Sequence, residues 1–183
     1  MPPKAKYDKE QIIDIAFNIV RENGADILTA RNLAQAMGTS TAPIFNVFDT
    51  IAEIKQAVID KGKALYADYV RDGLNEPIPF KGAGLKYIQF SKEEPKLFKL
   101  LFMTGDGNEH ITNYLPAFDE NSVLVLDKLV QSYNIDNEKA KKLYNHMAVY
   151  SYGFASLFAQ KINIFTMEDI DQMLSELFLA LTE

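Results

Sequence analysis

Four short polar side chains lie close together in the sequence: Thr39, Ser40, Thr41 and Asn46. Hydroxyl and amide groups of this kind hydrogen-bond to phosphate oxygens and read the edges of bases in the major groove of DNA. They are not accompanied by a histidine and carboxylate pair at a spacing typical of catalysis. These residue types therefore favour the binding of double-stranded DNA over covalent chemistry.

Sequence features of the common enzyme classes are absent. The chain has no cysteine, which excludes a thiol nucleophile, a cysteine metal site and a disulfide. It contains neither a glycine-rich phosphate loop nor the GxSxG and HExxH motifs. The two histidines, His110 and His146, lie far apart in the sequence, and a metal site needs several converging ligands. We expect no enzyme activity, no metal and no cofactor, although isolated Ser, Asp and Glu side chains leave an unfamiliar active site open.

The polar run lies between two short segments with helical spacing. Leu33 and Met37 are four residues apart, and Ile44 and Val47 are three apart, so each pair faces one side of its own helix. Gly38 is placed where the first helix should end. This spacing predicts two helices packed at a tight turn, which is a helix-turn-helix.

The turn carries its own signals for the start of the second helix. The Thr39 and Ser40 hydroxyls can accept hydrogen bonds from the free amides of its first turn. Pro43 would lie in that turn, where a missing N–H costs little. Helix hairpins of other all-helical proteins share this spacing, so the flanking segments matter.

The flanking segments predict more helices. Asp8 can cap a helix with an apolar stripe that ends at Gly24, and Thr50 can cap a long helix that ends within residues 72–79. We therefore expect an all-α protein with a three-helix domain over residues 1–48, a connecting fourth helix over 49–76 and a second helical domain over 77–183.

Four short motifs follow one another within about the first 50 residues. They are Glu22-Asn23-Gly24, Arg31-Asn32-Leu33-Ala34, Gly38-Thr39-Ser40 and Phe45-Asn46-Val47-Phe48. In order and spacing they resemble the N-terminal domain of the TetR (tetracycline-repressor-like) family of transcriptional regulators. That family has an amphipathic helix ending in Glu-x-Gly, an Arg-x-(Ile/Leu)-Ala run, Gly-(Val)-Ser, and Tyr/Phe-x-x-Phe at the close of the recognition helix.

The chain departs from the family at three positions. Phe45, Val47 and Ile51 stand where the family usually has a tyrosine, a histidine and a lysine. The family's tyrosine hydroxyl and lysine amine commonly contact phosphates, and Lys55 is our inferred substitute for the lysine. The predicted DNA-binding residues are Thr29, Arg31, Thr39, Ser40, Thr41, Pro43, Phe45, Asn46, Lys55, Lys4 and Lys6.

Charge limits how this chain can bind a polyanion. The net charge is −6, and residues 1–62 hold slightly more acidic than basic side chains. General attraction to DNA is therefore weak, and affinity must depend on a few placed groups. Lys4 and Lys6 can contribute from an N-terminal arm in the minor groove; the alternative is a solvated tail.

The second domain contains several expected helices. They cover about 115–133, 136–160 and 167–181, with Asp136 and Thr166 as N-caps, and Pro95 begins a shorter one. The helix over 136–160 is apolar nearly all round, so it must be covered on more than one side.

The resemblance implies a small inducer inside this second domain, which is rich in aromatic side chains. Such a site is usually an apolar pocket with a few polar groups. The alternative for each predicted residue is that it packs in the core and contacts no ligand. The predicted ligand-binding residues, for an unidentified small apolar or aromatic ligand, are Tyr87, Phe90, Phe98, Phe102, Met103, Tyr114, Phe118, Met147, Tyr150 and Phe154.

The resemblance also implies a homodimer built from the last two helices. Two recognition helices about one DNA turn apart would read a palindromic operator; the alternative is simple burial within a monomer. The predicted interface residues are Ala148, Ser151, Tyr152, Ala155, Phe158, Met173, Leu174, Leu177, Phe178 and Leu181.

Taken together, these patterns predict a DNA-binding transcriptional regulator, a repressor released from its operator by a small ligand. No apolar run is long enough to cross a bilayer, and the N-terminus lacks the apolar centre of a signal peptide, so we expect a soluble, cytoplasmic protein. The alternative is a TetR-like fold that has lost operator binding and acts through protein partners.

Overall fold

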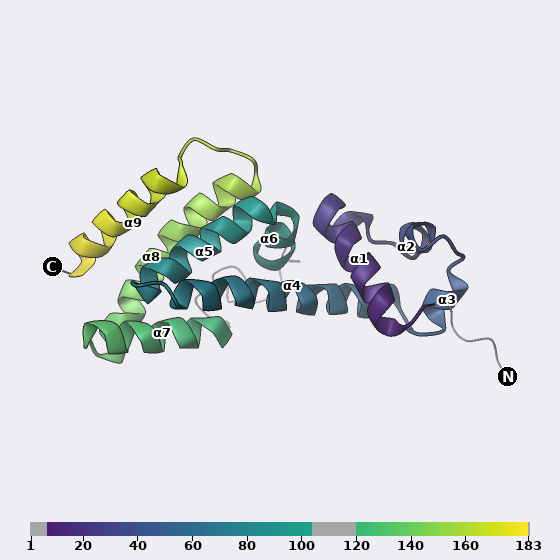
Figure 1. The fold of residues 1–183 in the computed structure, drawn as a ribbon, viewed down its shortest axis with the longest axis horizontal. Coiled ribbons are helices and arrows are strands. Elements are labelled where there is room, and N and C mark those ends of the chain that lie inside the picture. The colour runs from purple at the N-terminus through teal and green to yellow at the C-terminus, as the bar shows by residue number, and fades with distance from the viewer. Residues whose placement is uncertain (1–6, 104–119, 183) are drawn as a thin grey trace. The chain divides into compact units, whose positions relative to one another are not determined.

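The computed structural model describes residues 7–103 and 120–182, and within these ranges all regular structure is helical (Figure 1). The expected all-α class is therefore confirmed. The chain divides into two compact units, Met1–Ala64 and Leu65–Glu183, and the division falls inside the long helix α4 (Ile51–Leu74).

From Tyr7 onward, the first unit forms three further helices and one turn of 3-10 helix. These elements are α1 (Lys9–Asn23), η1 (Ala25–Ile27), α2 (Ala30–Ala36) and α3 (Ala42–Phe45). The Asp8 carboxylate accepts a hydrogen bond from the Gln11 amide at 2.8 Å, and the Gln11 side chain accepts one from the Asp8 amide at 3.1 Å. This reciprocal cap begins α1, and Gly24 ends it with φ 96°, both as expected.

The small core of the first unit forms where these helices meet. Its buried apolar residues are Ile12, Ala16, Phe17, Val20, Leu28, Leu33, Ala34, Met37, Ile44, Phe48, Ile54 and Val58. The expected contribution of Val47 is wrong, because Val47 is half-buried while Phe48 is 1% exposed. The amides of Val47 and Phe48 both donate to the Ile44 carbonyl, and this turn stacks Phe48 over Ile44, four residues earlier.

The described residues of the second unit form the end of α4 and five more helices. They are α5 (Pro79–Glu93), α6 (Pro95–Phe102), α7 (Glu120–Tyr133), α8 (Asn137–Ala159) and α9 (Met167–Thr182). Helix α5 contacts α6, α7, α8 and α9, and it lies alongside α8 (Figure 1). Pro95 is the first residue of α6, as expected.

Two expected N-caps of the second unit are confirmed. The Asp136 carboxylate accepts from the Lys139 amide at 2.8 Å and begins α8. At α9 the Thr166 hydroxyl accepts from the Asp169 amide at 3.1 Å, and the Asp169 carboxylate accepts from the Thr166 amide and hydroxyl at 2.8 Å each. Those two hydrogen bonds from Thr166 lower the pKa of Asp169.

The end of α4 and the start of α5 meet backbone to backbone through two glycines. A Cβ added to Gly82 would lie 2.2 Å from the Gly73 carbonyl oxygen, and one added to Gly73 would lie 2.6 Å from the Gly82 carbonyl. Neither position has room for a side chain, so this contact sets the angle at which α5 leaves α4.

Among the described residues, no helix combines the length and the apolar character needed to cross a bilayer.

Candidate nucleic-acid interface and ligand cavity

The turn between α2 and α3 is closed by Gly38, as expected. Gly38 has φ +63°, a left-handed conformation that side chains disfavour, and its amide donates to the Gln35 carbonyl at 3.1 Å. The Thr39 amide then reaches back to the Ala34 carbonyl at 3.0 Å. These two bonds satisfy the last carbonyls of α2 and present the polar run immediately after it.

The hydroxyls of the polar run do not serve as caps. Thr41 occupies the N-cap position of α3, yet no side-chain hydrogen bond caps this helix, so the expected capping by Thr39 and Ser40 is wrong. The reason is that Thr41 has helical φ and ψ, which place its side chain outside cap geometry. Ser40 and Thr41 are exposed and Thr39 is half-buried, so their hydroxyls are available to an external partner.

The other predicted DNA-binding residues of this segment differ in their exposure and in their hydrogen bonds. The Thr29 hydroxyl accepts from the Asn32 amide at 3.1 Å and caps α2. Pro43 is half-buried in the first turn of α3, as expected. Asn46 is exposed at the end of α3, and Phe45 is 46% exposed, which is unusual for so large an apolar side chain.

The basic residues of the first unit fall into two groups. Lys9 pairs with Glu53 at 3.5 Å, and Lys61 pairs with Asp14. Arg31, Lys55 and Lys63 are exposed, and within the described residues none of the three has a salt bridge. Arg31 and Lys55 are the two of these that were predicted from the sequence to bind DNA, and both are free to meet a phosphate. Lys4 and Lys6 lie outside the described residues.

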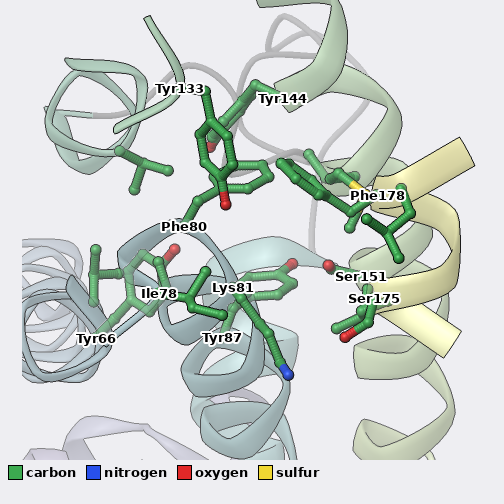
Figure 2. A pocket seen from close by; sticks show the side chains of 18 residues that line it. Tyr66, Ile78, Phe80, Lys81, Tyr87, Tyr133, Tyr144, Ser151, Ser175 and Phe178 are labelled. Atoms are coloured by element: carbon green, nitrogen blue, oxygen red, sulfur yellow. The ribbon is translucent and has the colours of Figure 1, made fainter. Parts of the chain in front are cut away.

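A cavity of about 370 Å³ lies inside the second unit, between α4, α5, α7, α8 and α9 (Figure 2). Most of its surface is apolar, with tyrosine and serine hydroxyls as the main polar groups. It is lined by Tyr66, Val70, Ile78, Phe80, Lys81, Ala83, Gly84, Tyr87, Val125, Tyr133, Tyr144, Met147, Ala148, Ser151, Leu174, Ser175, Phe178 and Leu179. Ile78 and Leu179, 48% and 60% exposed, mark where it opens to solvent.

Only part of the predicted ligand set lines this cavity. Tyr87 and Met147 do. Phe90, Phe98 and Phe102 instead form a packed cluster with Tyr66 and Tyr87, in which the ring centroids of contacting pairs lie 5.0–6.5 Å apart. Two members of this cluster, Tyr66 and Tyr87, also line the cavity, so the cluster packs against one of its walls. Met103 follows α6 and does not line the cavity, and Tyr114 and Phe118 lie outside the described residues.

The other two predicted ligand residues lie on a second surface. Tyr150 and Phe154 line a shallow groove between α8 and α9, and their rings pack 5.1 Å apart at 81°. The groove is also lined by Asn145, His146, Val149, Gly153, Leu157, Phe165, Met173 and Leu177. Val149 is 58% exposed, so an apolar strip of this outer groove faces solvent.

Six of the ten predicted interface residues line one of these two surfaces, and the other four line neither. Ala148, Ser151, Leu174 and Phe178 line the cavity, while Met173 and Leu177 line the outer groove. Ala155 and Phe158 are buried within the single chain. Tyr152 and Leu181 are half-buried, and the Tyr152 hydroxyl donates to the Phe102 carbonyl at 3.4 Å.

Several lining residues were not predicted from the sequence, including Tyr66, Phe80, Tyr133 and Tyr144. One signal could have found some of them: Tyr144, Met147 and Ser151 recur at intervals of three and four residues, which places them on one face of α8. Tyr66 and Phe80 have no such signal, because α4 and α5 meet only in the tertiary fold.

The described residues contain no group of three or more His, Asp and Glu side chains that could hold a metal ion. None of the protein families described by sequence models matches this chain, and no curated protein is significantly similar to it.

Proposed function

We propose that this protein is a DNA-binding transcriptional regulator of the TetR type, a repressor that a small ligand releases from its operator. The observation that carries the proposal is the exposed polar surface at the α2–α3 turn. Its hydroxyls have no capping role, and two unpaired cations, Arg31 and Lys55, belong to the same unit. Such a set suits phosphate and base contacts.

Base recognition is assigned to the residues at and after the turn. Thr41 and Asn46 supply groups that hydrogen-bond to base edges, and the exposed ring of Phe45 supplies an apolar contact suited to a thymine methyl group. Phe45 thus has a role that does not need the hydroxyl of the family's tyrosine.

Homodimerisation is assigned to the outer groove between α8 and α9. Val149, Gly153, Met173 and Leu177 supply an accessible, mainly apolar surface there, whereas most predicted interface residues of α8 are already covered in the single chain. A pair of chains joined across this groove would carry two recognition helices to a palindromic operator. The resemblance to the TetR family supports this assignment.

Ligand control is assigned to the cavity. Helix α4 supplies Tyr66 and Val70 to the cavity wall, and its first residues belong to the DNA-binding unit. A ligand that favours one position of α4 can therefore change the spacing of the recognition helices, provided that it binds the two states with different affinity.

The test is a fluorescence-anisotropy titration against DNA from immediately upstream of the coding region, with scrambled DNA as competitor, at two salt concentrations. We expect selective binding by a dimer, weakening as salt rises. Asn46→Ala should lower affinity about tenfold or more, whereas Asn18→Ala, an exposed asparagine on α1, should leave it unchanged.

The rival function is a TetR-like protein that acts through protein partners. The acidic balance of the chain and the three departures from the family motif favour it. Equal affinity for operator-region, genomic and scrambled DNA, together with no effect of Asn46→Ala, would reject the proposed regulator and support this rival.

A further inference from the structure

We propose that the cavity of the second unit takes an uncharged, mainly aromatic molecule with one polar group directed at Ser151. The inference rests on the proposed function in that it names the ligand class of the regulator's effector site. Its chemistry follows from the cavity alone, whose volume of about 370 Å³ suits a small organic ligand.

The charge of the ligand follows from Lys81, the one charged side chain on the described cavity wall. Its ammonium lies 2.6 Å and 2.8 Å from the two carboxylate oxygens of Asp171 on α9. Figure 2 shows the Lys81 side chain running away from the cavity. The cation is therefore already neutralised, and a charged ligand would lose its hydration without gaining a counterion.

The aromatic character of the ligand follows from the rings that surround the space. Phe80 packs 5.7 Å from Phe178 and 6.3 Å from Tyr144, and Tyr133 packs 4.9 Å from Phe178. These rings come from α5, α7, α8 and α9. A flat ligand placed against the cavity side of these rings can make the offset and edge-to-face contacts that aromatic groups prefer.

The polar group of the ligand follows from Ser151. Its side chain is 5% exposed, and its hydroxyl has no hydrogen bond to another described residue. Figure 2 shows the hydroxyls of Ser151 and Tyr87 at the same end of the cavity. A hydroxyl at the cavity wall that has no hydrogen bond within the described protein can bond to a donor or acceptor on the ligand.

The test uses two fluorescent probes with the same ring skeleton. N-phenyl-1-naphthylamine is uncharged, and 8-anilino-1-naphthalenesulfonate adds one sulfonate. On the full-length protein we expect one uncharged probe per chain, bound about tenfold or more tighter than the anion. We also expect 2-naphthalenemethanol to displace it at lower concentration than 1-octanol, because only the former stacks on rings.

Two variants locate the probe. Ala148→Phe fills the cavity from α8 and should remove probe binding, while Val123→Phe, at a position on α7 that is 58% exposed, should preserve it. Circular dichroism checks that both remain folded; should Ala148→Phe fail this check, Ser151→Val replaces it, with an expected severalfold loss of 2-naphthalenemethanol affinity. Loss of probe binding in Val123→Phe alone would place the probe outside the cavity and overturn the proposal.

If the anionic probe bound more tightly than the uncharged one, and Lys81→Met removed that binding, the ligand would be an organic anion. This result would also overturn the proposal. Equal displacement by the two alcohols would overturn the aromatic assignment. Operator binding is measured separately on the same samples. If the protein binds the uncharged probe but shows no selective DNA binding, this inference stands and the proposed function is rejected. If it binds DNA selectively but not the uncharged probe, the proposed function stands and this inference is rejected.

Discussion

At the scale of single residues, a hydrogen-bonded carboxylate, that of Glu93, joins α4 to α5. The Tyr69 hydroxyl donates to the Glu93 carboxylate at 2.5 Å, and the Gln89 amide donates to it at 2.7 Å. The Tyr69 bond and then the Gln89 bond lower the pKa of Glu93. A lowered folded-state pKa contributes stability above the unfolded pKa, and this contribution is lost as pH falls through the folded pKa.

Tyr69→Phe should therefore raise the pKa of Glu93 toward its ordinary value and reduce the loss of stability on acidification. Carboxyl chemical shifts followed by NMR from pH 2 to pH 7 measure the pKa, and urea unfolding at several pH values measures the stability. Tyr150→Phe removes a hydroxyl from the outer groove and should change neither. An unshifted Glu93 titration in Tyr69→Phe would contradict the assigned cause.

A second residue-scale prediction concerns the unpaired cation Arg31. Arg31→Ala should weaken binding to operator and to other DNA by about the same factor and reduce the slope of log affinity against log salt by about one unit, because one phosphate contact is lost. The control is Lys61→Ala, since that lysine is paired with Asp14. Anisotropy titrations at four salt concentrations give both quantities; equal slopes for the two variants would argue against Arg31 as a phosphate contact.

At the scale of elements, the glycine contact between α4 and α5 determines how the cavity is built. Gly82→Ala should destabilise the protein by about 3 kcal/mol, because its Cβ would meet the Gly73 backbone and the two helices would have to separate. Gly84→Ala is the matched control in the same helix. Its Cβ would lie 3.7 Å from the Ser151 hydroxyl oxygen, an ordinary contact.

Because alanine favours helix over glycine, Gly84→Ala should stabilise the protein by about 0.5–1 kcal/mol. Urea unfolding curves compare the two variants with the parent protein. A similar small change for both would mean that the contact at Gly82 relaxes without cost, and the rigid crossing of α4 and α5 would have to be abandoned.

At the scale of the whole molecule, the proposed dimer depends on the outer groove of α8 and α9. Val149→Arg should convert a dimer to a monomer and weaken operator binding by about tenfold or more, because a desolvated, unpaired charge would lie in the contact. Val123→Arg is the matched control, since Val123 on α7 is also 58% exposed. Sedimentation velocity gives the mass of each variant, and a parent protein that is monomeric at micromolar concentration would exclude this interface.

The secondary structure was largely predictable because its signals are local. Asp8, Thr50, Asp136 and Thr166 were expected as N-caps, and each accepts the hydrogen bond that begins its helix. Gly24 and Gly38 were expected at helix ends and have positive φ. A cap depends on residues three or four positions away, so its partners can be found in the sequence.

The candidate sites were less predictable because they depend on contacts between distant segments. Phe90, Phe98 and Phe102 have the same residue type as Phe80 and Phe178, yet the first three pack on one another while the last two line the cavity. Composition cannot distinguish a ring in the core from a ring at a pocket.

The sequence by itself therefore determined most of the helices, the ends marked by their confirmed caps and glycines, and the turn at Gly38 between α2 and α3, since hydrogen bonds within a few residues set these. Tertiary structure alone decided which face of α8 meets the cavity and which remains open in the outer groove. Helix α8 is apolar on most sides, so its own pattern cannot choose a partner. The choice is made by α5, which crosses α4 at Gly73 and Gly82 and then covers one side of α8.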